Sequence, residues 1–138
     1  MLTQKQKIGE IGENMAVKHL KKRGFKILNR NYRKKWGEID IIAEKDSSGS
    51  FLRRIFTPNK ILHFIEVKSV AFKPTNQGYQ PEENVHSWKQ KRLGRAVKTY
   101  LLDKKIPEKM GYQIDIMAVF IDLNSKKAKI RMTENVII

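Results

Sequence analysis

The sequence predicts an α/β fold, and three features of the chain support this prediction. Two stretches have helical periodicity, five shorter stretches are rich in Ile, Val and Phe, and turn-forming residues separate them. With 138 residues, the chain is long enough to bury a hydrophobic core, and we expect a single domain over residues 1–138. We expect helices over 3–23 and 84–103, and strands over 25–33, 36–44, 61–70, 112–122 and 127–132.

The first predicted helix is bounded by two residues that suit its ends. Thr3 can cap the N-terminus, and Gly24 suits the left-handed position that follows many helices. At about 100° per residue, Glu13 lies at the edge of the apolar stripe beside Gly9 and Ala16, where small residues leave room for another backbone or a ligand. The stripe itself is formed by Ile8, Ile11, Met15 and His19, extended by Gly12 and Ala16.

The second and third predicted strands carry charged side chains where a buried strand is normally apolar. Because side chains alternate between the two faces of a strand, Glu66 and Lys68 project from the same face of the third strand. If the two strands pair, Asp40 of the second strand converges with Glu66 and Lys68. In the second strand we expect Glu38, Asp40 and Ile42 on one face, and Ile39, Ile41 and Ala43 on the other.

The remaining segments lead to simpler expectations. We expect a long β-hairpin over residues 45–60 and a loop over 71–83 that could reach over a substrate. The tail 136–138 is apolar, and we expect it to pack against the rest of the protein. His63 is expected to be a packed strand residue. Asp115 is a lone acid in an apolar strand, either a structural partner for a Lys or Arg or an outlying member of the site, and we expect the structural role.

The charge balance of the chain predicts a polyanionic partner. There are 29 Lys and Arg against 14 Asp and Glu, a net charge of +15, which most often indicates nucleic acid, although a solvated basic surface is an alternative. No apolar run approaches the ~20 residues that cross a bilayer, and the N-terminus has no signal-peptide core. Without cysteine, disulfides are excluded. We expect a soluble cytoplasmic protein that binds no membrane.

Two groups of basic or polar residues are candidates for nucleic-acid contact. A basic run lies between Tyr32 and Trp36, where it forms either a phosphate-binding and base-stacking surface or a solvated hairpin turn. A second group lies near the start of the second predicted helix, where it could point at the charged strands. The residues are Arg33, Lys34 and Lys35 in the first group, and Lys89 and Gln90 in the second.

The chemistry available to this residue set is that of carboxylates and lysine. The chain has no phosphate-binding loop and no nucleophile–histidine motif, and three His without Cys make a zinc site improbable. Asp40 and Glu66 would repel each other when ionised, and Mg²⁺, with Mn²⁺ as an alternative, would remove that repulsion and activate water on a phosphodiester. Lys68 could orient the water, and Glu13 could add a ligand directly or through water. The alternative is a surface Glu66–Lys68 ion pair worth only ~0–1 kcal/mol.

Four motifs follow one another in an order typical of one protein family. They are Gly9-x-x-Gly12-Glu13-x-x-Ala16-x-x-x-Leu20-x-x-x-Gly24-Phe25-x-Ile27-Leu28-x-x-Asn31-Tyr32-Arg33, Gly37-Glu38-Ile39-Asp40-Ile41-Ile42-Ala43, Phe64-Ile65-Glu66-Val67-Lys68 and Lys89-x-x-Arg92-Leu93. With these motifs the chain resembles the YraN-like proteins of the PD-(D/E)xK, or restriction-endonuclease-like, superfamily. That family is similar to archaeal Holliday-junction resolvases.

The resemblance implies a restriction-endonuclease-like fold, with a central mixed sheet of about five strands flanked by helices. It implies Mg²⁺-dependent cleavage of phosphodiester bonds. We therefore expect a DNA endonuclease or a resolvase-like enzyme that selects DNA by its structure. By position, Asp40 and Glu66 would be metal ligands, Lys68 the catalytic lysine and Glu13 the helix acid near the metal. Lys89 or Gln90 would border the site.

The sequence leaves alternative functions open. The protein could be a nucleic-acid-binding module on a nuclease fold without catalysis, or an interaction protein with a basic surface. A resolvase would need a two-fold homodimer to cut two strands. The sequence does not distinguish junctions, flaps, single strands and RNA as substrates.

Overall fold

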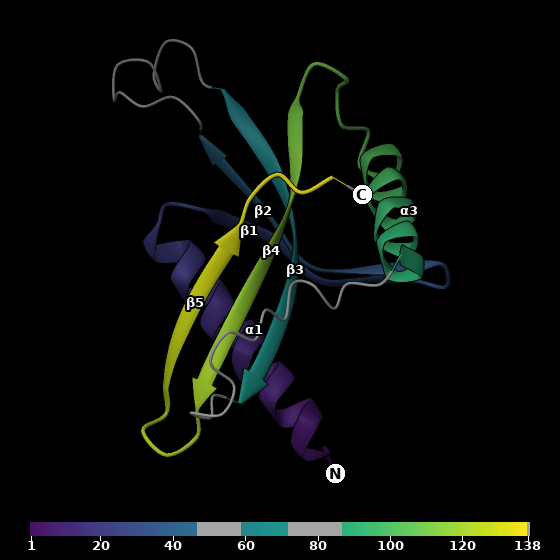
Figure 1. Cartoon of the computed structure of the whole chain (residues 1–138). Coiled ribbons are helices and arrows are strands. Elements are labelled where there is room, and N and C mark those ends of the chain that lie inside the picture. The colour runs from purple at the N-terminus through teal and green to yellow at the C-terminus, as the bar shows by residue number, and fades with distance from the viewer. Residues whose placement is uncertain (47–58, 72–86, 138) are drawn as a thin grey trace.

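The computed structural model describes residues 1–46, 59–71 and 87–137, and its fold is α/β. One five-stranded mixed sheet lies between α1 on one face and α3 on the other (Figure 1). This arrangement is consistent with a restriction-endonuclease-like fold and confirms the predicted class. The elements are α1 (Gln4–Lys22), β1 (Lys26–Lys34), β2 (Gly37–Asp46), β3 (Lys60–Ala71), α3 (Ser87–Asp103), β4 (Gly111–Asp122) and β5 (Lys127–Thr133).

The strands follow one another across the sheet in chain order. Neighbouring strands are antiparallel except β3 and β4, which are parallel, and α3 lies in the connection between them. The five predicted strands and two predicted helices are all present. Most of the hairpin predicted over 45–60 and of the loop predicted over 71–83 lies outside the described residues. Within the described ranges, no helix combines the length and apolar character needed to cross a membrane.

The ends of α1 are formed as the sequence predicts. The hydroxyl of Thr3 accepts a hydrogen bond from the Gln6 amide at 3.1 Å, and the Gln6 side chain accepts one from the Thr3 amide at 2.9 Å. This reciprocal pair satisfies amides that have no partner within the helix. Gly24 follows the helix with φ +89°, a conformation that a glycine adopts without steric cost.

The buried face of α1 is centred differently from the prediction. The helix residues buried against the sheet are Gly12, Ala16, Val17 and Leu20, whereas Ile11 of the predicted stripe is 39% exposed. Small residues contribute little hydrophobicity to a periodic pattern, but they allow the closest approach of a helix to a sheet. A Cβ atom at Gly12 would overlap the Ser69 side chain of β3, so the helix axis lies as close to β3 as a glycine permits.

The side chains of β2 stop alternating regularly between the two faces of the sheet at Asp40, contrary to the prediction. Ile41 and Ala43 pack under α1, but Ile39 packs with Ile42 under α3. Asn31 of β1 lies between the residues that pair with Ile39 and Ile41, and its φ is +52°. A left-handed residue is uncommon inside a strand, although Asn tolerates it better than most. The β1–β2 hairpin therefore changes direction at this point.

The turn of the β1–β2 hairpin is fixed to α3. A Cβ atom at Gly37 would overlap the Arg92 carbonyl oxygen, and the Trp36 indole donates a hydrogen bond to the Thr99 hydroxyl at 2.8 Å. Figure 1 shows the hairpin turn running beside this helix. The basic run from Arg33 to Lys35 is therefore held next to α3.

A buried polar cluster fixes the opposite end of the sheet. Asp115 is fully buried and lies 2.6 Å from His63 Nδ1. It also accepts hydrogen bonds from the Gln113 amide group at 2.8 Å and the Asn135 backbone at 2.9 Å. Asp115 therefore has structural partners, which are not the Lys or Arg predicted. Asn135 leads into a tail that packs only in part, because Val136 contacts the core whereas Ile137 is 96% exposed.

The close contact at Gly12 predicts different effects of alanine at the two glycines of α1. We expect Gly12→Ala to destabilise the protein by about 1–3 kcal/mol, because the added methyl forces α1 and β3 apart. Nothing lies within 4 Å of a Cβ atom at Gly9, so Gly9→Ala should be neutral or stabilise by about 0.5–1 kcal/mol. Urea unfolding of both variants measures the difference. Equal effects would show that α1 does not pack as described.

Candidate functional site

The candidate site begins where β2 separates from β3. The ladder between these strands ends at the pair Ile41–Ile65. Beyond it the Asp40 carboxylate, rather than a backbone carbonyl, accepts the hydrogen bond of the Val67 amide, at 2.8 Å. From Glu66 onward β3 pairs only with β4. The separation of the two strands therefore draws an acidic side chain into the sheet.

Asp40 and Glu66 form a buried carboxylate pair at this point. The Glu66 side chain is only 4% exposed, and the two acids are close enough to share a hydrogen bond. Burial and then the negative charge of Glu66 raise the pKa of Asp40 to about 8, against the smaller opposing effect of the Val67 amide. In the absence of a metal, the pair therefore holds a proton at neutral pH.

Two lysines lie on this pair, and they come from different elements. Lys89 of α3 places its Nζ 2.6 Å from Glu66 Oε1, and Lys68 of β3 places its Nζ 3.6 Å from the same oxygen. Burial, and then the neighbouring Lys89, lower the pKa of Lys68. Burial also acts to lower the pKa of Lys89, but its hydrogen bond to Glu66 and its other polar neighbours raise it overall. Glu66 is thus neutralised mainly by Lys89.

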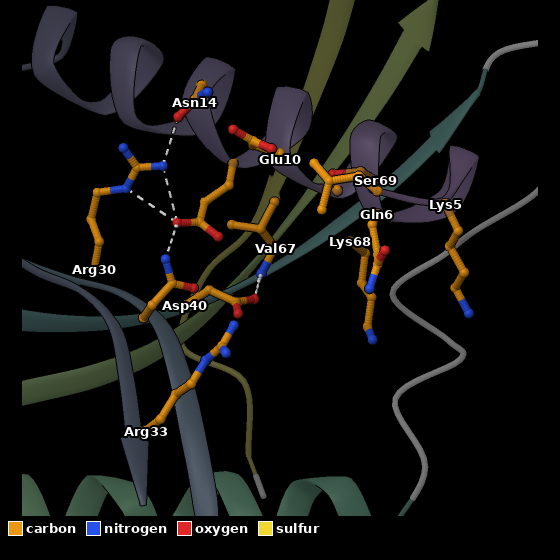
Figure 2. A pocket seen from close by; sticks show the side chains of 14 residues that line it. Lys5, Gln6, Glu10, Asn14, Arg30, Arg33, Asp40, Val67, Lys68 and Ser69 are labelled. Carbon is orange, nitrogen blue, oxygen red and sulfur yellow. Dashed lines mark hydrogen bonds and ion pairs between the residues drawn. The ribbon is translucent and has the colours of Figure 1, made fainter.

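Glu13 is held beside the pair by two residues of β1. Its Oε1 accepts hydrogen bonds from Arg30 Nε and Asn31 Nδ2, both at 3.1 Å. Arg30 also donates to Asn14 of α1 at 2.7 Å, so Figure 2 shows its guanidinium reaching across to the helix. The left-handed backbone at Asn31 that redirects the hairpin thus coincides with a side chain that bonds to Glu13.

A cavity of about 810 Å³ runs from Asp40 along the first half of α1. Figure 2 shows Asp40 joined to Val67, with Lys68, Gln6 and Lys5 lining the same cavity. Three cationic side chains besides Lys68 line it together with three acidic ones, which gives a wall of mixed charge. The lining residues are Leu2, Lys5, Gln6, Gly9, Glu10, Glu13, Asn14, Arg30, Asn31, Arg33, Asp40, Val67, Lys68 and Ser69.

The structure brings together three of the four predicted catalytic residues. Asp40, Glu66 and Lys68 converge, whereas Glu13 faces the cavity but is engaged by Arg30 and Asn31. In the part of the chain that the structure describes, no three acidic, His or Cys side chains are grouped closely enough to hold a metal ion by themselves. Asp40 and Glu66 therefore lie together as a pair of acids, and Glu66 is already bonded to Lys89.

The predicted nucleic-acid residues fall into two places. In the hairpin, Arg33 lines the cavity and lies 3.6 Å from Glu38, while Lys34 lies 5.3 Å over the Tyr32 ring and Lys35 is exposed in the turn. The second group lies in the first turn of α3. There Lys89 contacts Glu66, and the next residue, Gln90, is half-buried.

Sequence reasoning missed the residues that position Glu13. Arg30 received no role, and Asn31 was only part of a family motif. An asparagine within an otherwise regular strand pattern was the one available signal, because this residue type tolerates a positive φ. The partner of Arg30 lies 17 positions away in the sequence and could not be found from spacing.

The raised pKa of Asp40 predicts a pH-dependent stability of the metal-free protein. Between about pH 4 and pH 8 the folded state keeps a proton that the unfolded state releases, so the stability contributed by Asp40 is complete below pH 4 and is lost as pH rises towards 8. The Asp40→Asn variant has a side chain of the same shape as aspartate, but this side chain does not titrate. We expect wild type to lose about 1–3 kcal/mol relative to this variant between pH 5 and pH 8.

Urea unfolding in the presence of a chelator measures this difference. Glu38→Gln is a matched control, because Glu38 is an exposed acid two residues earlier in the same strand. Its stability relative to wild type should not change over the same pH range. A pH-independent difference for Asp40→Asn would mean that the two carboxylates are not forced together.

Comparison with known proteins identifies relatives along nearly the whole chain. Residues 12–119 match the group described as Uncharacterised protein family UPF0102. A UPF0102 protein of Campylobacter hominis is 37% identical over 130 residues, which covers 94% of this chain and 93% of the relative. UPF0102 proteins of Campylobacter fetus subsp. fetus and Campylobacter lari are 36% and 34% identical, each covering 91% of this chain and 88% of the relative. The chain therefore belongs to the UPF0102 family, the YraN family that its sequence motifs resemble.

Proposed function

We propose that this protein is a metal-dependent endonuclease that hydrolyses phosphodiester bonds in DNA, with Mg²⁺ as its metal and Mn²⁺ as an alternative. The observation that carries the proposal is the convergence of Asp40, Glu66 and Lys68 beside a cavity of about 810 Å³. Two acids and a lysine are the groups that hold a divalent ion and stabilise a reacting phosphate. The names of the relatives state no activity, so the proposal rests on this geometry and on the family resemblance.

The donor atoms of the site fit a hard divalent cation. Asp40 and Glu66 offer carboxylate oxygens, the ligands that Mg²⁺ prefers, and burial followed by the charge of Glu66 raises the pKa of Asp40 to about 8. Mg²⁺ typically keeps several waters beside one or two carboxylates, so two acids suffice. When bound there, the ion would polarise the phosphodiester and lower the pKa of a neighbouring water.

Lys68 and Glu13 would supply the remaining interactions. The Nζ of Lys68 would donate hydrogen bonds to the phosphate oxygens, where negative charge develops as the bond breaks. Arg30 and Asn31 both bond to Oε1 of Glu13. This arrangement leaves Oε2 to accept a hydrogen bond from a water in the cavity, so Glu13 would act through water rather than as a direct ligand.

The basic surroundings of the site favour DNA as the substrate. The chain carries a net charge of +15, and the hairpin residues Arg33, Lys34 and Lys35 are held next to α3 by the contacts of Trp36 and Gly37. Phosphate contacts of this kind bind and position a nucleic acid without reading its sequence. A resolvase-like, structure-selective activity would require a homodimer, because two strands must be cut.

A cleavage assay with an isosteric variant tests the proposed activity. Wild type and Glu66→Gln are incubated with branched, flapped, single-stranded and duplex DNA in Mg²⁺ or Mn²⁺. We expect the variant to lose at least about a hundredfold in rate, because it removes a charged metal ligand. Both proteins should bind DNA equally in the presence of a chelator. Salt-sensitive binding without cleavage of any substrate would instead assign the protein as a nucleic-acid-binding module.

The position of Gly9 allows a test of the cavity as the DNA path. Gly9 lines the cavity, and nothing lies within 4 Å of a Cβ atom built there, so a larger side chain would fill the cavity without disturbing the protein. We expect Gly9→Leu to weaken DNA binding several-fold in a fluorescence anisotropy titration, with a melting temperature equal to or above that of wild type. Binding equal to wild type would exclude DNA from this part of the cavity.

Two lysines of α1 provide a charge-matched test of the same path. Lys5 lines the cavity, whereas Lys7 is exposed two residues further on and does not line it. Lys5→Ala should weaken DNA binding and reduce the slope of log K against log salt by about 1, because one phosphate contact is lost. Lys7→Ala should change the slope less. Equal slopes for the two variants would indicate a diffuse attraction of the whole helix.

A further inference from the structure

The shortest charge pair of the candidate site joins two residues that the proposed reaction does not require to touch. Lys89 Nζ lies 2.6 Å from Glu66 Oε1, with the side chains 29% and 4% exposed. The surface pair Arg33–Glu38 is longer, at 3.6 Å, and more exposed, at 71% and 48%. A short hydrogen bond between opposite charges that are largely shielded from water is stronger than a solvated ion pair. Lys89 is therefore held firmly on Glu66.

The position of Lys89 in its own helix does not favour a positive charge. It lies in the first turn of α3, which begins at Ser87 and has no acidic residue in that turn. The N-terminus of a helix carries a partial positive charge that repels a cation. The attraction that offsets this repulsion comes from Glu66 of β3, with Asp40 of β2 contributing to it. The positive charge of Lys89 is thus stabilised by the carboxylate pair and not by its position in α3.

We propose that Lys89 is an internal counter-cation of the carboxylate pair, and that a divalent ion must displace its ammonium group from Glu66 in order to bind. This inference rests on the metal site of the proposed function and adds a means of regulating it. A divalent ion held by the Glu66 carboxylate would lie close to the ammonium group bonded to the same carboxylate, and the two positive charges would repel each other. The two cations therefore compete for Glu66.

The competition has a consequence for substrate binding. An ammonium group displaced from Glu66 needs a new anionic partner, and a DNA phosphate at the site provides one. DNA would then favour metal binding, and the metal would favour DNA binding by the same factor, as linkage requires. Without DNA, Lys89 keeps the two acids assembled and keeps metal affinity low.

Calorimetric titration with Mn²⁺ alone, at pH 8 and without DNA, tests the competition. Lys89→Met removes the charge and keeps the length of the side chain. We expect it to bind Mn²⁺ about 5- to 100-fold more tightly than wild type, the usual range of coupling between two binding events. Lys91→Met is the matched control, because Lys91 is an exposed lysine two residues further along the same helix. It should bind Mn²⁺ nearly as wild type does.

Thermal unfolding provides a second measurement that does not depend on activity. In a chelator, Lys89→Met should melt at a lower temperature than wild type, and saturating Mn²⁺ should raise its melting temperature by more than it raises that of wild type. Lys89→Gln keeps a hydrogen-bond donor for Glu66 without the charge. It should also bind Mn²⁺ more tightly, so the proposal can be tested even if Lys89→Met does not fold.

The outcomes separate this inference from the proposed function. Suppose that wild type binds Mn²⁺ and that Asp40→Asn abolishes this binding, but that the folded Lys89 variants bind Mn²⁺ no more tightly than wild type. This result would overturn the role of Lys89 as a counter-cation and would leave the proposed metal site intact. An increase in Mn²⁺ affinity that is equal for Lys89→Met and Lys91→Met would also overturn this role, because it would show a general effect of net charge. Absence of Mn²⁺ binding in all proteins would overturn both the inference and the metal-dependent function.

Discussion

The candidate site depends on one hydrogen bond, from the backbone amide of Val67 to the carboxylate of Asp40. An amide in the interior of a sheet needs an acceptor, and β2 has already separated from β3 at this point. Asp40 provides the acceptor, and its carboxylate is thereby drawn next to Glu66. The raised pKa of Asp40 follows from this placement, because burial and a second acid both disfavour its charge.

Two local features of the backbone make this separation possible. The left-handed conformation of Asn31 lies where β2 changes its alternation, and the same residue donates a hydrogen bond to Glu13. Gly12 allows α1 to approach Ser69, the residue after Lys68. The bend of β1 at Asn31 and the absence of a side chain at Gly12 therefore help to hold Glu13 at the cavity that Asp40 also lines. A regular strand and a larger residue would weaken this arrangement.

The sequence was sufficient for the elements of the fold, because the periodicity of side chains is a local property. Asp40, Glu66 and Lys68 converge as predicted, but Asp40 does so where the pairing of β2 with β3 has ended rather than through that pairing. The sequence was insufficient where a contact depends on tertiary packing. The face of Ile39 was predicted wrongly because a period of two assumes an unbroken strand. The buried stripe of α1 was predicted at a different position from the observed one, because glycine and alanine contribute little to a hydrophobic pattern. Lys89 was predicted to point at the charged strands, but its contact with Glu66 of β3 could not be found from the spacing of residues.

The charges of the site and of its surroundings fit together if substrate and metal bind jointly. In a chain of net charge +15, the two acids would form a local centre of negative charge if both were ionised, and this charge would repel a phosphodiester at the position where it must react. Lys68 and Lys89 reduce this repulsion while no ion is present, but both then lie on Glu66. A divalent ion would neutralise both acids and free the lysines for the phosphate. The net positive charge of the protein would thus attract the DNA to a site that becomes favourable for it only when the metal is bound.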